Sequence, residues 1–249
     1  MEWYEIVLLV GAGIIAGFIN TLAGSGSLLT LPVFMAFGLS APVANGTNRI
    51  GILLQSITSV LSFKKQNLLD FRSALKIAVP SVIGSVFGAM IAVDVDEKAM
   101  RITIGILLIL MFFLILWKPD RWVKDHAGNP PLPQWAQILI FFFVGMYGGF
   151  IQAGVGFFLL AALVLASGLD LIKANALKVL LVFFYTPFSL AVFIINHQVD
   201  YKLGFIVAAG GIAGAWLGAR MSVKWGPQVV RIILLATLLV AAAKLLGVF

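Results

Sequence analysis

Two basic residues lie inside hydrophobic runs of this sequence, where a charge is hard to accommodate. Arg49 follows Ala44-Asn45-Gly46-Thr47-Asn48, and Lys178 ends Ala174-Asn175-Ala176-Leu177-Lys178. A charge in the hydrocarbon layer of a membrane costs several kcal/mol, so such a group is a functional candidate by default. The acidic residues all fall near predicted segment ends or in loops. Two cations without a carboxylate partner favour a path for an anion. The alternative is that both side chains snorkel from helix ends to the lipid headgroups.

Neutral hydrogen-bonding side chains and glycine-rich breaks accompany the two cations. The polar candidates are Asn20, Thr21, Ser25, Ser27, Asn45, Thr47, Asn48, Gln152 and Asn175, and the break glycines are Gly24, Gly26, Gly154 and Gly156. Glycine lets the backbone turn sharply, and a helix that starts at a break presents free N–H groups, which suit an oxyanion. We therefore expect these residues to bind substrate together with the two cations. For Asn20 and Gln152, the alternative is hydrogen bonding between helices.

An enzyme or a metal centre is not expected from this sequence. Gly24-Ser25-Gly26-Ser27 resembles the serine motif of intramembrane proteases, but the only histidines, His126 and His197, fall in predicted loops. A serine nucleophile needs a base within reach at the same depth. The sequence also has no cysteine, no pair of intramembrane carboxylates and no His/Asp/Glu cluster, which are the groups that thiol, aspartyl or metal chemistry requires. We predict no catalytic residue, no metal site and no cofactor.

The composition is typical of a membrane protein. Of the 249 residues, 61% are hydrophobic and 11% are charged, whereas about 25% are charged in an ordinary globular domain. The mean hydropathy is +1.08, and the length allows roughly eight to ten spans of about 20 residues. The net charge of +7 comes from cations in short loops beside apolar segments. That placement is typical of cytoplasmic loops and not of a nucleic-acid-binding surface, so we expect a lipid bilayer and no nucleic acid as partner.

Five hydrophobic segments can be read in each half of the chain. They cover about 5–22, 27–38, 43–63, 71–93 and 98–117, and then about 135–153, 157–168, 174–195, 202–221 and 227–247. A shift of about 130 residues superimposes the halves, placing Gly24-Ser25-Gly26 on Gly154-Val155-Gly156. The second segment of each half is too short to span a bilayer, so the first two segments are predicted to form a broken or re-entrant pair. We predict an all-α protein with transmembrane repeats at 1–117 and 135–249, joined by a polar loop at 118–134.

The distribution of basic residues predicts that the two repeats are inverted. If each leading pair returns to the side from which it entered, each half makes an odd number of crossings. One side then collects Lys64, Lys65, Arg72, Lys76, Lys118, Arg121, Lys124, Lys173, Lys178, Arg220, Lys224 and Arg231, and the other keeps Arg49, Lys98, Arg101, Lys202 and Lys244. The positive-inside rule places the first side in the cytoplasm. Both termini and the 39–45 and 196–202 loops are therefore expected outside the cytoplasm.

The two break regions resemble those of a known family. The first half of the chain is similar to the first repeat of the sulfite exporter TauE/SafE family. The similarity lies in Gly17-Phe18-Ile19-Asn20-Thr21-Leu22-Ala23-Gly24-Ser25-Gly26-Ser27, followed by Leu31-Pro32 and Ala44-Asn45-Gly46-Thr47-Asn48-Arg49. The second half resembles the second repeat of that family through Gly149-Phe150-Ile151-Gln152-Ala153-Gly154-Val155-Gly156 and Ala174-Asn175-Ala176-Leu177-Lys178. The resemblance implies a permease of the bacterial inner membrane. Such a permease moves sulfur-containing oxyanions, such as sulfite, sulfoacetate or related organosulfonates, usually outward.

The sequence therefore predicts a helical transporter that passes a small anion between its glycine breaks by alternating access. Arg49 and Lys178 would neutralise the anion, and the neutral groups would replace its water. A potential that is negative inside favours anion exit by about 2.3 kcal/mol per charge per 100 mV. Two alternatives stay open: a transporter of another solute, such as a carboxylate or a neutral metabolite, and a membrane protein that does not transport, such as an assembly partner or a protease. The coupling ion and the oligomeric state are also left open.

Overall fold

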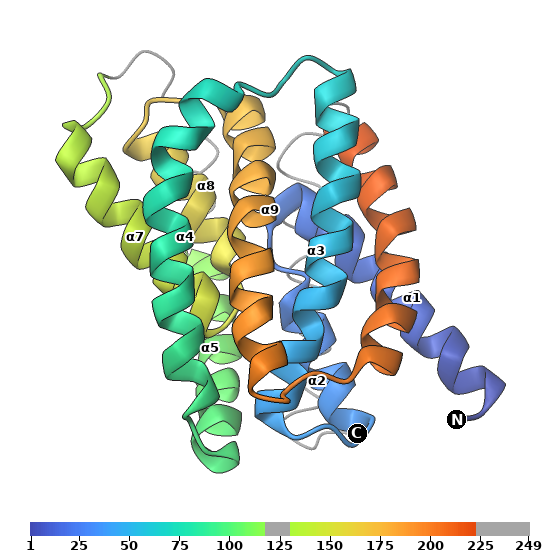
Figure 1. Ribbon diagram of the computed structural model, residues 1–249. Helices are drawn as coiled ribbons and strands as arrows, with labels where there is room; N and C mark the ends of the chain where they lie inside the picture. The colour runs from blue at the N-terminus through green and yellow to red at the C-terminus, as the bar shows by residue number, and fades with distance from the viewer. Residues whose placement is uncertain (118–129, 223–249) are drawn as a thin grey trace.

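The computed structural model describes residues 1–117 and 130–222, and every regular element in these ranges is a helix (Figure 1). The helices are α1 (Trp3–Ala23), α2 (Ser27–Ala36), α3 (Ala41–Lys65), α4 (Phe71–Val93), α5 (Glu97–Trp117), α7 (Gln134–Phe150), α8 (Val155–Leu165), α9 (Leu171–Ile195) and a helix over Tyr201–Ser222. Each of the nine predicted segments up to residue 221 corresponds to one of these helices, with ends that differ by a few residues. The predicted segment at 227–247 and most of the predicted loop at 118–134 lie outside the described residues.

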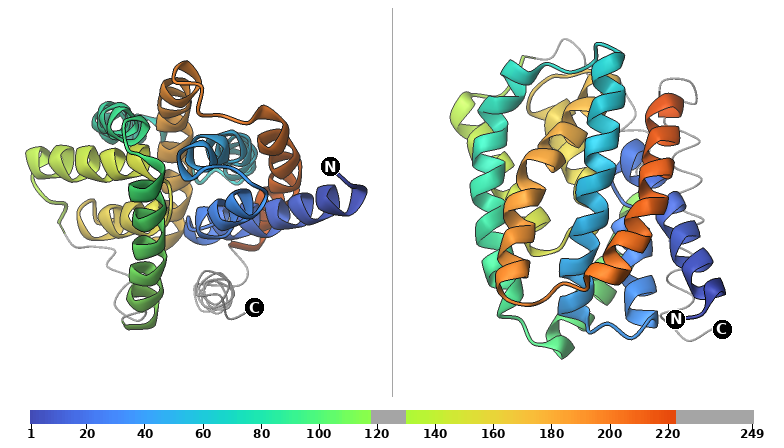
Figure 2. Two further views of the ribbon diagram at one scale, coloured as in Figure 1. Left: turned by 90° about the horizontal axis from the view of Figure 1, so that it is seen from below. Right: turned by 45° about the vertical axis from the view of Figure 1, so that its right-hand side comes forward.

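Helices α3 and α9 form the centre of the fold. They lie side by side and run in opposite directions (Figures 1 and 2). Their bounds, 41–65 and 171–195, differ by 130 residues at both ends. Local sequence explains where each begins: Pro42 stands in the first turn of α3, and the Asp170 side chain caps α9 by accepting a hydrogen bond from the Lys173 N–H at 2.9 Å. These positions suit proline and a short acidic side chain.

Two helical hairpins meet beside this central pair. Helix α1 ends at Gly24, which has a φ of 75°, and α2 begins three residues later; α7 is followed by Gly154, with a φ of 73°, where α8 begins. The α1–α2 hairpin opens toward one end of the molecule and the α7–α8 hairpin toward the other (Figure 1). At the point where they meet, the Gly156 N–H donates to the Gly24 carbonyl at 3.1 Å. A Cβ atom on either glycine would collide with the backbone of the other.

Each hairpin packs through glycines on a helix from the other half of the chain. A Cβ at Gly13 of α1 would meet the carbonyl of Val207, and one at Gly145 of α7 would meet the carbonyl of Ser81. The same close approach is made by Gly17, Gly210 and Gly214 between α1 and the 201–222 helix, and by Gly84, Gly88 and Gly149 between α4 and α7. Small residues let helix backbones pack this closely in a membrane. The two halves are therefore interlocked and do not pack as separate bodies.

The described helices have the length and surface of a membrane protein. Four of them are long and apolar enough to cross a bilayer: Trp3–Leu22, Ala74–Val93, Leu171–Ile195 and Tyr201–Ser222. Large apolar side chains such as Leu8, Phe87 and Trp216 are exposed on their outer surfaces, as expected for contact with lipid. The shorter apolar helices are α2, α7 and α8, the same helices that make up most of the two hairpins. The chain is thus a helical membrane protein.

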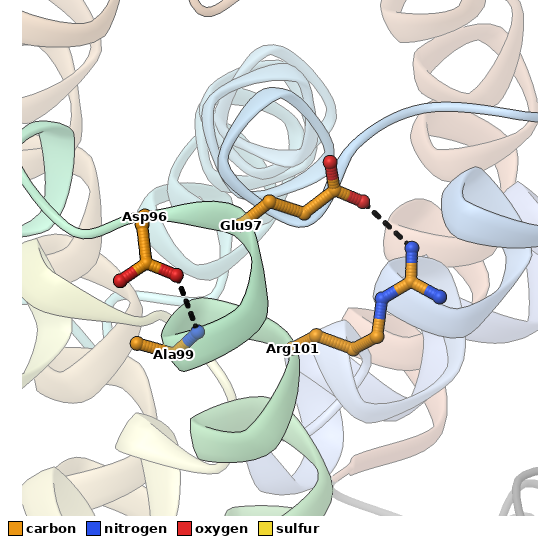
Figure 3. Close-up of polar contacts among 4 residues, drawn as sticks. All are labelled: Asp96, Glu97, Ala99 and Arg101. Atoms are coloured by element: carbon orange, nitrogen blue, oxygen red, sulfur yellow. Dashed lines mark hydrogen bonds and ion pairs between the residues drawn. The ribbon is translucent and has the colours of Figure 1, made fainter.

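Charged residues gather at the two ends of the bundle, with an excess of basic residues at one end and of acidic residues at the other. We call the end where α3 finishes and α4 and α9 begin the basic end; it carries Lys64, Lys65, Lys76, Lys173 and Arg220. We call the opposite end the acidic end; it carries Glu2, Glu5, Asp94, Asp96, Glu97 and Asp200. Figure 3 shows part of the acidic end, where Asp96 accepts from the Ala99 N–H at 2.9 Å and Glu97 pairs with Arg101 at 2.7 Å.

Candidate functional site

The Arg49 side chain is fully buried and crosses from α3 to the end of α7. Its Nη1 donates to the Gly148 carbonyl at 3.2 Å, to Gln152 Oε1 at 3.2 Å and to Ser189 Oγ at 2.9 Å. Its Nη2 donates to the Gly149 carbonyl at 2.5 Å. A cation at the C-terminal end of a helix is stabilised by the carbonyls that lack intrahelical partners. A residue from the first half of the chain thus holds the helix break of the second half.

Lys178 makes the reciprocal contact from α9 to the end of α1. Its Nζ donates to the carbonyls of Asn20 and Thr21 at 3.2 and 3.3 Å and to Asn175 Oδ1 at 2.7 Å. The side chain is 1% exposed and that of Arg49 is 0% exposed. Snorkelling is therefore the wrong interpretation for both cations, because their charged groups end inside the protein at the two helix breaks.

Neither buried cation has a carboxylate partner among the described residues. Arg101–Glu97 and Lys173–Asp170 form ion pairs, both at helix ends and away from the two buried cations. The positive charges of Arg49 and Lys178 are instead held by neutral oxygen atoms. Burying a charge without a counter-charge is costly, and the carbonyl ends of two helices offset only part of that cost. In the part of the chain that the structure describes, no acidic side chain therefore balances these two buried basic groups.

A cavity of about 20 Å³ lies where the two breaks face α3 and α9. Its lining residues are Asn20, Thr21, Gly24, Ile52, Gln55, Ser56, Ser59, Gln152, Val155, Lys178, Val179 and Val182. The volume corresponds to about one water molecule. Both halves of the chain contribute to the lining, and most of its polar groups can donate a hydrogen bond.

Two unambiguous donors determine the orientation of the amide side chains at the cavity. The Gly26 N–H, which can only donate, bonds to Asn20 Oδ1 at 2.7 Å, so Asn20 Nδ2 faces Gln55 and donates to its Oε1 at 2.9 Å. Arg49 also can only donate, so it bonds to Gln152 Oε1, and Gln152 Nε2 donates to the Tyr185 hydroxyl at 2.8 Å. Both amide oxygens at the breaks are thus engaged by donors, and N–H groups remain for a ligand.

Several predicted site residues are placed around the cavity without lining it. Asn45 donates to the Phe150 carbonyl at 2.8 Å, Thr47 Oγ1 accepts from the Asp200 N–H at 2.8 Å, and Asn48 links Thr30 to Ser27. Asn175 holds Lys178. Ser25 Oγ is buried and has no hydrogen-bond partner among the described residues. Gly26, Gly154 and Gly156 shape the breaks; of the predicted residues, the cavity is lined by Asn20, Thr21, Gly24, Gln152 and Lys178.

The sequence analysis missed one wall of the cavity and two partners of Arg49. The wall is formed by Gln55, Ser56 and Ser59 on α3, and the partners are Ser189 and, through Gln152, Tyr185. A signal for the wall was present, because these polar residues follow Asn48 along a mainly apolar run at positions that recur with the helical period. Such spacing places side chains on one face of a helix.

Comparison with known proteins relates the chain to a family of transporters. The sequence model described as "Sulfite exporter TauE/SafE" matches residues 9–245. A Haemophilus influenzae protein named "Probable membrane transporter protein" is 27% identical over 226 residues, which are 91% of this chain and 88% of that protein. The Escherichia coli K12 protein "Probable membrane transporter protein YfcA" is 29% identical over 232 residues, or 93% of this chain and 86% of that protein. No solved structure gives a significant match.

Proposed function

The chain belongs to the sulfite exporter TauE/SafE family and is a membrane transporter, not an enzyme; we propose that it exports a small sulfur-containing oxyanion, such as sulfite, sulfoacetate or another organosulfonate, across the bacterial inner membrane. The family description supplies the sulfur chemistry. The reasons for an anion come from the site itself.

The observation that carries the proposal is the pair of buried cations without a carboxylate partner. Arg49 and Lys178 place two positive charges at the helix breaks, where neutral oxygens are their hydrogen-bond partners among the described residues. An anion that enters the centre of the bundle relieves this excess charge, whereas a cation increases it. The site thus favours negatively charged solutes on electrostatic grounds.

Hydrogen bonding supports the same selectivity. The amide oxygens of Asn20 and Gln152 accept from the Gly26 N–H and from Arg49, and one N–H of each amide is used by Gln55 or Tyr185, so each retains one N–H near the cavity. Gln55 on α3 also lines the cavity, and because its Oε1 accepts from Asn20, its Nε2 group is a further donor there. An oxyanion has several acceptor oxygens and no required donor, so a cavity rich in donors replaces its water well. We propose that the other predicted polar residues and break amides contribute when the site opens.

We further propose that the two halves, 1–117 and 135–249, are inverted repeats and that transport follows alternating access. Support comes from the opposite directions of α3 and α9, their displacement by 130 residues and the hairpins that open toward opposite ends. The cavity lies between the two breaks and has room for about one water molecule. Passage of a larger oxyanion therefore requires the halves to move relative to one another.

The orientation that we propose places the basic end in the cytoplasm. Lys64, Lys65, Lys76, Lys173 and Arg220 gather there, in agreement with the positive-inside rule. The N-terminus and the loop at 196–200 lie at the acidic end, which would face away from the cytoplasm. The membrane potential, negative inside, favours outward movement of an anion by about 2.3 kcal/mol per charge per 100 mV.

A carrier of small carboxylates is the second candidate, because Lys178 and the amide donors suit any small oxyanion. The test is uptake of radiolabelled sulfite by proteoliposomes under an imposed potential of either sign, with sulfoacetate, thiosulfate, acetate and a neutral sugar as competitors. Flux that follows the potential and is blocked by the sulfur anions supports the proposal. Blockage by acetate alone supports the carboxylate carrier, and flux equal to that of empty liposomes rejects sulfite as the substrate.

A further inference from the structure

We propose that the two buried cations have different roles: Lys178 contacts the transported anion, whereas Arg49 is a positioning residue that acts through Gln152. This inference rests on the proposed function of anion transport. From sequence the two residues are equivalent, since each is a cation inside the third segment of its half. The structure separates them by their access to the cavity and by the way in which their donors are used.

Lys178 reaches the cavity directly. It is one of the lining residues, together with Asn20 and Thr21, whose carbonyls it binds. These two hydrogen bonds are long, at 3.2 and 3.3 Å, compared with the usual length of about 2.7–2.9 Å for an ammonium and an oxygen anion. An ammonium on a flexible stem can exchange these neutral acceptors for the oxygens of an anion with a small movement. Lys178 is therefore placed to pair with a ligand in the cavity.

Arg49 is separated from the cavity and is committed to protein groups. It is not a lining residue, and its two terminal nitrogens donate to four acceptors near the α7 break and on α9. The Phe193 ring lies 4.5 Å from the guanidinium carbon. Its Nε–H has no partner among the described residues. The two terminal nitrogens are thus fixed by four acceptors, and a ligand would have to break several hydrogen bonds to reach them.

Gln152 transmits the effect of Arg49 to the cavity. Arg49 holds Gln152 Oε1 at 3.2 Å, and Gln152 itself lines the cavity. Without Arg49, nothing at that point forces the amide oxygen away from the cavity, and a flipped amide would present an acceptor to the anion. Loss of Arg49 is thus expected to weaken the α7 break and the donor orientation, while the charge that contacts the substrate remains.

The absence of cysteine from the chain allows a direct test by chemical rescue. Lys178→Cys and Arg49→Cys are each treated with aminoethyl methanethiosulfonate, which forms a mixed disulfide and places an ammonium at about the length of a lysine. Sulfite uptake is measured in proteoliposomes before and after treatment, and after reduction of the disulfide. Untreated wild-type protein and exposed Lys98→Cys serve as controls, since Lys98 lies at the acidic end.

We expect Lys178→Cys to lose about tenfold or more in uptake, as removal of a charged hydrogen bond to a ligand does, and to regain most of it on treatment. Arg49→Cys should also lose uptake but regain little on treatment, because one ammonium group cannot make the four hydrogen bonds that the Arg49 guanidinium makes. Equal rescue of both variants, or rescue of Arg49→Cys alone, would overturn the division of roles. Absence of flux in wild-type protein would instead reject the proposed function itself.

A second measurement covers variants that fold poorly. The midpoint of thermal unfolding in detergent is recorded with and without sulfite, because a ligand that binds the folded state raises it. Lys178→Met is expected to keep a midpoint near that of wild type and to lose the rise caused by sulfite. Arg49→Lys should have a lower midpoint than wild type, but sulfite should still raise that midpoint. The opposite pattern contradicts the inference.

Discussion

At the scale of single residues, Gln152 connects the buried charge to the cavity. Its two amide atoms are held by different partners, with Oε1 accepting from Arg49 and Nε2 donating to Tyr185. Asn20 has a matching arrangement between Gly26 and Gln55. In both cases a backbone or guanidinium donor selects which end of the amide remains for a ligand. The selectivity for anions is thus predicted to depend on amide orientation as well as on charge.

Gln152→Glu is expected to separate stability from transport. The new carboxylate would pair with Arg49 and compensate a buried charge, so the midpoint of thermal unfolding should stay equal to that of wild type or rise. The same change removes an N–H donor and adds a negative charge at the cavity, so sulfite uptake should fall by about tenfold or more. Gln134→Glu, at the exposed start of α7, is the matched control. Undiminished uptake by Gln152→Glu would show that Gln152 does not face the anion.

At the scale of elements, the contact between the two helix breaks depends on glycine. Gly24 has a φ of 75° and its Cα lies against Gly156, so a side chain there meets both backbone strain and a collision. Gly38 has a φ of 90° but open space around the position of a Cβ. This pair of glycines separates the effect of backbone conformation from the effect of close approach.

Gly24→Ala is expected to abolish transport, whereas Gly38→Ala should retain it. A left-handed conformation costs alanine roughly 1–2 kcal/mol in either position, but only at Gly24 would the methyl group also push the two breaks apart. Uptake by proteoliposomes and the thermal midpoint of both variants provide the measurement. If Gly24→Ala transported as well as Gly38→Ala, the contact between the breaks would not be needed for the cavity.

Packing between α1 and the 201–222 helix gives a second comparison at this scale. Gly13 faces the Val207 carbonyl, while Gly11, on the same helix, has nothing within 4 Å of the position that a Cβ would occupy. Gly13→Ala should therefore destabilise the fold by about 1–3 kcal/mol through overpacking. Gly11→Ala should be neutral or gain up to about 1 kcal/mol from helix propensity. Thermal midpoints in detergent measure the difference, and equal midpoints would contradict the close packing of these helices.

At the scale of the whole molecule, the arrangement places corresponding loops at opposite ends. Gln66 follows α3 at the basic end, and Asn196 follows α9 at the acidic end, 130 residues later. The two halves interlock at two helix pairs: α4 packs against α7, and α1 packs against the 201–222 helix. Relative movement of the halves would therefore be carried by these glycine-lined contacts.

Single cysteines at these two positions test the proposed topology. In intact cells, a membrane-impermeant maleimide is expected to label Asn196→Cys but to label Gln66→Cys only after the membrane is made permeable. The cysteine-free wild-type chain is the background control. Reversed labelling would reject the orientation, and labelling of both residues from one side would reject the inversion of the repeats.

Sequence alone determined the membrane class, the approximate helix bounds and the family, because hydropathy, helix length and glycine motifs are local properties of the chain. Polar residues in apolar runs stand out, so the sequence also singled out Lys178, Asn20 and Gln152, which line the cavity; their contact with a substrate stays a prediction. The partners of the cations depended on packing: Arg49 bonds to Gly148, 99 residues away, and Lys178 to Asn20, 158 residues away. Only the tertiary structure decided that each cation holds the helix break of the other half. It also decided that Gln55, Ser56 and Ser59 form a wall of the cavity. Finally, it showed that Lys178 lines the cavity and Arg49 does not. The physical reason is that side-chain partners so distant in sequence are set by how the helices pack, which no local pattern encodes.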